Sequence, residues 1–213
     1  MTATRWRQAA LVALWGLVAA TFGLCAYSLA SGWPPNDLGA LGTARTFLAA
    51  VVLVWWTQVF ARYTRPAPTP EEDGVWRSLR ALFPWLTSLR LALWGLSLFV
   101  YLAGFLPEAN PVALTALATV ELGFILAKNA VYGTLVRFAA APLEVAGRAR
   151  LGSWLNAAAA LSLAIGVVNL VPVAGLSGER PAADLWVYGL HAALDVAASL
   201  LALRAVQTAP GVE

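Results

Sequence analysis

The sequence predicts an all-α fold, a polytopic integral membrane protein with six transmembrane helices. The first observation is composition: 60% of the 213 residues are hydrophobic and 12% are charged, with a mean hydropathy of +0.71. A soluble domain usually carries about 25% charged residues. The second observation is that the apolar runs reach about 20 residues, beyond the length of a strand. We therefore expect lipid to be the main solvent of one transmembrane domain that covers residues 1–213.

Each of six apolar segments is expected to be one membrane-spanning helix. About 20 helical residues cross the roughly 30 Å of hydrocarbon in a bilayer. None of the segments alternates strictly between apolar and polar residues, as the strands of a membrane barrel do. The segments cover residues 8–30, 42–61, 86–106, 111–136, 151–176 and 184–206.

The first segment also has features of a signal peptide. Arg5 and Arg7 precede it, and Ser28-Leu29-Ala30 is similar to a cleavage site. Its apolar stretch is longer than the roughly 7–15 residues of a signal-peptide core, so we expect a true span. Within it, Gly16, Ala20 and Gly23 predict close helix packing, as do the four consecutive alanines 157–160 of the fifth segment.

The connections predict three helical hairpins and an orientation. Three loops are short and rich in turn residues (SGWPPNDLG, LPEANP and LSGERPAAD), whereas RYTRPAPTPEEDGVWRSLR and APLEVAGRAR are longer and charged. If the helices alternate in direction, ten arginines fall on one side and two, Arg45 and Arg180, on the other. By the positive-inside rule both termini are then cytoplasmic, in a multi-pass protein of the cell membrane. The ten arginines are Arg5, Arg7, Arg62, Arg65, Arg77, Arg80, Arg137, Arg148, Arg150 and Arg204.

Charged side chains inside the fourth segment point to a functional site. Glu121 and Lys128 are seven residues apart, which places them on nearly the same helical face, roughly 10 Å apart along the axis. Glu121 is near the middle of the predicted span, where an unpaired charge costs several kcal/mol. A partner, water or a function is needed to offset that cost.

The sixth segment carries a second polar line. His191, Asp195 and Ser199 follow each other at steps of four, and Tyr188 precedes the histidine by three residues, so they share one helical face. His191 and Asp195 lie within about one helical turn of the depth of Glu121. We expect the three side chains to meet if the fourth and sixth helices are neighbours.

Three interpretations of this cluster remain open. In the first, Glu121, His191 and Asp195 form a proton or cation relay, because two carboxylates in a dry site cannot both ionise easily. In the second, they form a structural hydrogen-bond network between helices. In the third, one imidazole and two carboxylates bind a metal, although their spacing matches no metal motif. Lys128 either extends to the inner interface or pairs with a carboxylate, and pairing would oppose the relay.

Other polar residues have simpler expectations. Arg90, near the cytoplasmic end of the third span, either extends to the interface or binds an anionic group entering from the cytoplasm. Arg45 is its counterpart at the outer edge of the second span. Asn129, Asn156 and Asn169 are expected to form interhelical hydrogen bonds. Cys25 is expected to be a buried apolar thiol.

We expect a transporter or permease for a small solute, a proton or a cation, with Glu121, His191, Asp195, Lys128, Arg90, Tyr188 and Ser199 as candidate pathway residues. The alternative is a non-catalytic membrane subunit or scaffold. No hydrolase, P-loop or dinucleotide motif appears, so no catalytic residue, metal or cofactor is predicted, and an enzyme is the least favoured class. The expected partners are the lipid bilayer and either further copies of the chain or other subunits of a membrane complex, but not nucleic acid.

Overall fold

The computed structural model describes residues 2–31, 37–64, 74–100, 102–103, 111–138, 145–170 and 182–209. Over this part of the chain the fold is all-helical, and six long helices are each apolar enough to cross a membrane. Over these residues the predicted all-α fold, with six helices able to span a membrane, is therefore confirmed. The helices are α1 (Ala3–Ala30), α2 (Asp37–Tyr63), α3 (Gly74–Val100), α4 (Pro111–Phe138), α5 (Val145–Leu170) and α6 (Ala182–Thr208).

Each predicted span corresponds to one of these helices, and the largest difference is at the start of α3. This helix begins at Gly74 rather than near residue 86, and it runs through Pro84. The candidate span within this helix is Arg80–Val100, which begins six residues before the predicted start. Near Pro84, the Thr87 hydroxyl donates to the carbonyl oxygens of Phe83 and Pro84, at 3.1 and 2.9 Å. The predicted ends at residues 106 and 176 lie outside the described residues.

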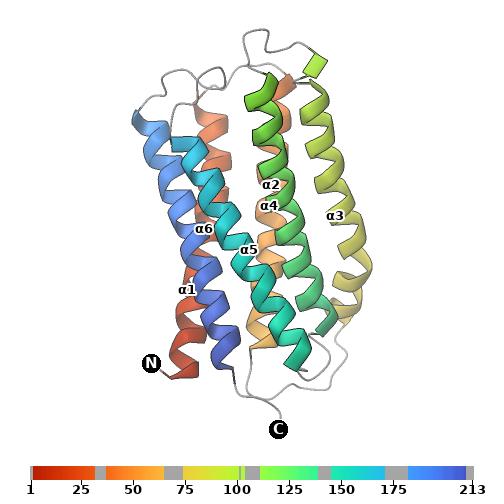
Figure 1. The fold of residues 1–213 in the computed structure, drawn as a ribbon, viewed down its shortest axis with the longest axis vertical. Helices are drawn as coiled ribbons and strands as arrows, with labels where there is room; N and C mark the ends of the chain where they lie inside the picture. The colour runs from red at the N-terminus through yellow and green to blue at the C-terminus, as the bar shows by residue number, and fades with distance from the viewer. Residues whose placement is uncertain are drawn as a thin grey trace.

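The six helices stand side by side in an elongated bundle (Figure 1). α1 packs against α2 and α6, α5 packs against α4 and α6, and α3 packs against α2 and α4. A further contact joins α2 to α4. The first and last helices are thus neighbours, and α1 begins at the same end of the bundle at which α6 ends (Figure 1). We call this end the terminal end.

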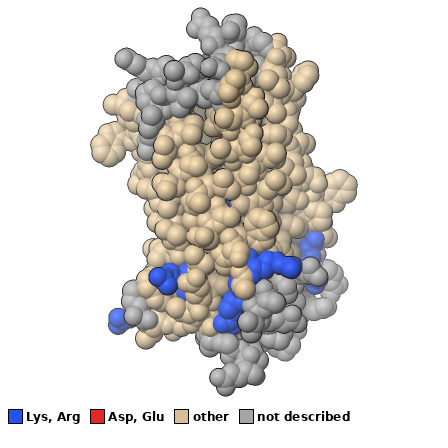
Figure 2. All heavy atoms as spheres, in the orientation of Figure 1, with Lys and Arg blue, Asp and Glu red and all other residues tan. Residues whose placement is uncertain are grey.

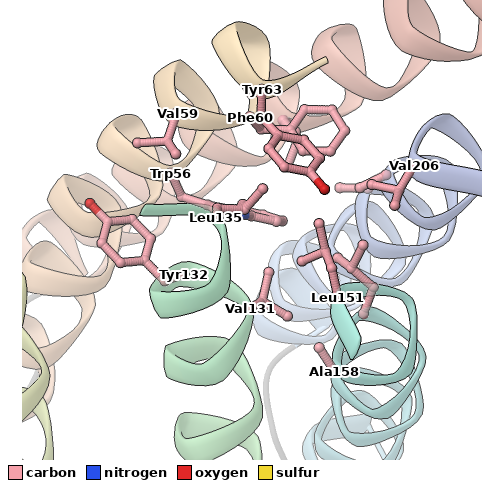
Figure 3. Packing of buried hydrophobic residues seen from close by; sticks show 14 of the residues in the cluster. Trp56, Val59, Phe60, Tyr63, Val131, Tyr132, Leu135, Leu151, Ala158 and Val206 are labelled. Carbon is pink, nitrogen blue, oxygen red and sulfur yellow. The ribbon is translucent and has the colours of Figure 1, made fainter. Parts of the chain in front are cut away.

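An apolar core fills the terminal end of the bundle. Figure 3 shows side chains from α2, α4, α5 and α6 that meet there, among them Phe60, Leu135 and Leu151, which are fully buried. Leu14 of α1 belongs to the same cluster. Lipid is as apolar as these side chains, so their contribution comes from close packing rather than from removal of water. The core closes this end of the bundle.

Two glycines mark close helix approaches. A Cβ at Gly166 would lie 2.8 Å from the side chain of Ala192, so α5 and α6 approach closely there. A Cβ at Gly133 would lie 3.0 Å from the ring of Phe83, between α4 and α3. The predicted close contacts at Gly16 and Gly23 are wrong, because a Cβ at either position would meet nothing within 4 Å. Small residues in apolar helices therefore did not all indicate interfaces.

The basic side chains have an uneven distribution. On the face in Figure 2, Lys and Arg side chains gather toward the terminal end, and the middle of the bundle shows almost no charged side chains. At this end Arg7 of α1 donates to the Thr64 hydroxyl at 3.1 Å and to the Ala61 carbonyl oxygen at 2.9 Å. These hydrogen bonds connect α1 to the C-terminal end of α2.

Candidate functional site

A cavity of about 350 Å³ lies inside the bundle, and all six helices contribute to its wall. Its lining includes residues 17–24 of α1, 42–56 of α2 and 191–195 of α6, so it lies between the apolar core and the opposite end of the bundle. Trp56 and Tyr132 belong both to the core and to the lining, and they form its floor on the core side. Besides Tyr132, the ionisable side chains in the wall are Arg45, Arg90, Glu121, Lys128, His191 and Asp195.

Lys128 and Asp195 form a buried ion pair between α4 and α6. The Lys128 Nζ is 2.6 Å from the Asp195 Oδ1, and the two side chains are 12% and 9% exposed. Lys128 also donates to Ser199 Oγ at 3.1 Å, and Ser162 of α5 donates to Asp195 Oδ2 at 2.8 Å. The lysine therefore does not extend to the interface, and the predicted pairing with a carboxylate is the one observed.

Aromatic rings add to the environment of this ammonium group. Lys128 Nζ lies 5.6 Å from the ring centroid of Trp56 and 5.4 Å from that of Phe124. The negative face of an aromatic ring attracts a cation at such distances. The charge of Lys128 is therefore stabilised by one carboxylate, one hydroxyl and two rings.

Glu121 has a different cationic partner. Its Oε2 lies 3.2 Å from a terminal nitrogen of Arg45, and the other terminal nitrogen of Arg45 donates to Ser97 Oγ at 3.1 Å. Arg45 lies five residues from the start of the candidate span Ala40–Tyr63, and its side chain lines the cavity. Its guanidinium reaches inward because a carboxylate and a hydroxyl inside the bundle accept its hydrogen bonds.

His191 bonds to α1 rather than to a carboxylate. Its Nε2 lies 3.0 Å from Thr21 Oγ1, and the same hydroxyl donates to the Leu17 carbonyl oxygen at 2.7 Å. A hydroxyl has one proton to donate. Because the Thr21 hydroxyl donates its proton to Leu17, it can only accept from the histidine. We therefore assign the ring proton of His191 to Nε2, which donates to Thr21 Oγ1. The other ring nitrogen is then free to accept when the imidazole is neutral.

Arg90 is also directed into the bundle. A terminal nitrogen of its guanidinium donates to Asn129 Oδ1 at 2.8 Å, and the side chain lines the cavity. The expectation that Arg90 extends to the membrane interface is therefore wrong. Asn129 forms the interhelical hydrogen bond expected of it, whereas Asn156 is exposed and Asn169 is outside the residues whose side chains are described.

The structure thus brings Glu121, His191 and Asp195 to one cavity, but it gives each a different partner. Among the described contacts, none joins Glu121 to Asp195 directly. Tyr188 is half-buried on α6 outside the cavity lining, and Ser199 is fully buried behind Lys128. Within the described ranges, no three His, Cys, Asp or Glu side chains are grouped closely enough to hold a metal ion.

Three residues that bind the charged and histidine side chains of the cavity were not predicted from the sequence. Arg45 was assigned to the outer edge of its helix, and Thr21 and Ser162 carried no signal above many similar residues. Hydroxyl residues in apolar helices often bond to their own backbone. Only the spatial position of the neighbouring helix distinguishes those that also bind a charged group.

Comparisons with protein-family models, with curated proteins and with solved structures find no match to this chain. The fold and the site together define a class: a six-helix, multi-pass membrane protein with a charged cavity at its centre.

Proposed function

We propose that this protein is a transporter or permease for a small solute, and that the solute passes through the central cavity. The observation that carries the proposal is the gathering of three basic side chains, two carboxylates and one histidine around one cavity inside a bundle of spanning helices. Ionisable groups at membrane depth are costly, and they mark substrate or ion pathways in membrane proteins. The proposed orientation has the terminal end in the cytoplasm of the cell, because the basic residues gather there.

The cavity itself supports transport over a purely structural network. Ion pairs that only hold helices together need no empty space beside them. An unfilled cavity destabilises a protein, because the atoms around it lose packing contacts. A volume of about 350 Å³ next to both ion pairs is within the size range of small-molecule sites, roughly 300–1,000 Å³. This volume supports the proposal that the wall binds a small solute.

The apolar core is the barrier that transport must open. It fills the terminal end below the floor residues Trp56 and Tyr132, with Leu135 and Leu151 packed behind them. In this structure the cavity and the terminal end are separated by these side chains. Transport requires a second arrangement in which the helices separate at the core, as in alternating access.

The test uses the purified chain in liposomes. Shrink–swell light scattering measures uptake of urea and glycerol and, with an ionophore that carries the compensating charge, of potassium and benzenesulfonate. An entrapped pH dye measures proton movement. We expect faster flux of at least one solute than in empty liposomes, and loss of that flux in Glu121→Gln and Asp195→Asn. Asp184→Asn is the matched control. Asp184 lies in the first turn of α6, outside the cavity lining, and accepts a hydrogen bond from Tyr27 of α1.

Two results would count against the proposal. Flux equal to that of empty liposomes for every solute would favour the alternative, a non-catalytic membrane subunit, and recovery of stoichiometric partners in mild detergent would then support it. Wild-type flux in both Glu121→Gln and Asp195→Asn would remove these residues from the pathway.

A further inference from the structure

The charges around the cavity do not balance. Its wall holds three basic side chains, Arg45, Arg90 and Lys128, and two acidic ones, Glu121 and Asp195. With His191 neutral and the other five ionised, one positive charge is in excess. The two ion pairs account for Arg45 and Lys128, so the excess charge resides on Arg90.

Arg90 also has hydrogen-bonding capacity to spare. Its guanidinium carries five N–H donors, and in the described part of the chain its bond is to one neutral acceptor, Asn129 Oδ1. No carboxylate pairs with it among the described residues. A cation at membrane depth requires a compensating partner, and a bound anion would supply both the charge and the acceptors.

The remaining polar groups of the wall also favour an anion over a cation. Both carboxylates already hold a basic side chain, at 3.2 Å for Glu121 and 2.6 Å for Asp195. A cationic solute would have to displace one of these cations.

Much of the wall is apolar, which defines the rest of the ligand. Leu17, Leu24, Val52, Leu93, Ile125 and Ile165 contribute to it. A small inorganic ion would leave this surface uncovered, whereas an organic anion would place its charged end at Arg90 and its body against the aliphatic side chains. Guanidinium groups bind planar carboxylates through two parallel hydrogen bonds.

We propose that the cavity binds a small organic monoanion, a carboxylate or sulfonate with an apolar body, with Arg90 as its principal charged ligand. This proposal rests on the proposed function in one respect, which is that the bound anion is the transported solute. Its charge is opposite to that of the proton or cation expected from the sequence.

Binding is tested separately from transport, on the full chain in detergent. Benzoate, benzamide and benzylammonium have similar bodies and carry negative, neutral and positive head groups. We expect benzoate to raise the unfolding temperature in a saturable way, as a ligand of the folded state does, and the other two to leave it unchanged. Equal or stronger stabilisation by benzylammonium or benzamide would overturn the anion site. So would the failure of acetate, hexanoate and benzoate alike.

Variants of Arg90 test the assignment of the ligand. Arg90→Gln should weaken benzoate binding by roughly 10- to 100-fold, the effect of losing hydrogen bonds to a charged group. Arg90→Lys keeps the charge without the planar fork, so its loss should be smaller. Arg80→Gln is the matched control, because Arg80 is exposed on the same helix outside the cavity, and its affinity should be unchanged. Wild-type benzoate affinity in folded Arg90→Gln, with unchanged discrimination against benzylammonium, would refute Arg90 as the ligand.

The two proposals fail in distinguishable ways. Benzoate binding without flux of any solute would retain the anion site and overturn transport. Flux of potassium, protons or a neutral solute without benzoate binding would retain transport and overturn the anion site. Benzenesulfonate serves for the flux measurement, because its permanent charge prevents leakage through the lipid.

Discussion

Replacing Lys128 by Met is expected to destabilise the protein by about 3–5 kcal/mol, the cost of removing one partner of a buried ion pair. The structure places this pair in the buried class, because the two side chains are 12% and 9% exposed and the charged atoms are 2.6 Å apart. Met has a similar length and volume, so the substitution removes the charge with little change in packing. The Asp195 carboxylate would retain only the hydrogen bond from Ser162 among its described partners.

A double-mutant cycle with Lys128→Met, Asp195→Asn and the double variant isolates the pair. We expect a coupling free energy of about 2 kcal/mol or more, above the average of about 0.6 kcal/mol for interhelical hydrogen bonds in a membrane protein. Reversible unfolding in mixed micelles, followed by helical circular dichroism, provides the free energies. A coupling near 0.6 kcal/mol or below, with Lys128→Met as stable as the wild type, would refute the ion pair as a buried, charged interaction.

Three further predictions concern packing, exposure and reactivity. Gly166→Ala should lower the free energy of unfolding by about 1–3 kcal/mol, since its new Cβ would lie 2.8 Å from a side-chain carbon of α6. The Cβ of Gly23→Ala would meet nothing within 4 Å, so this variant should be nearly neutral in the same unfolding assay. Glu121→Gln should cost about 1 kcal/mol or less, because its ion pair is 24% and 33% exposed, and a larger loss than in Asp195→Asn would contradict the ranking. Lys128 is the only lysine of the chain, and it should react slowly with an amine-modifying reagent until the protein is denatured. Mass spectrometry of its peptide measures the modification, and rapid modification of the folded protein would contradict the burial of Lys128.

The helices could be predicted because the bilayer imposes a length and an apolar composition on each span. The start of α3 was missed for the same reason. Arg80 interrupts the continuous apolar run on which the prediction rested, and Pro84 disfavours a continuous helix, yet α3 runs unbroken from Gly74.

The candidate site could be predicted in part. Charged residues inside apolar spans were identifiable individually. The tendency of helical side chains to lean toward the helix N-terminus was consistent with pairing of Lys128 with Asp195 or Glu121, and the structure shows the pair with Asp195. Spacing along one helix determines which face a residue occupies, but not which helices lie opposite that face. The pairing of Glu121 with Arg45 and of His191 with Thr21 depends on neighbours from α2 and α1, so sequence spacing could not reveal it.

The central claim is that a solute passes through the cavity, and filling the cavity tests it most directly. Ala49 lines the cavity, and Ala92 is exposed on α3. Benzenesulfonate uptake would be measured in liposomes that contain wild type, Ala49→Trp or Ala92→Trp, each shown by circular dichroism to be folded. We predict uptake by the wild type and by Ala92→Trp, and little or none by Ala49→Trp. Undiminished uptake by folded Ala49→Trp would contradict the claim.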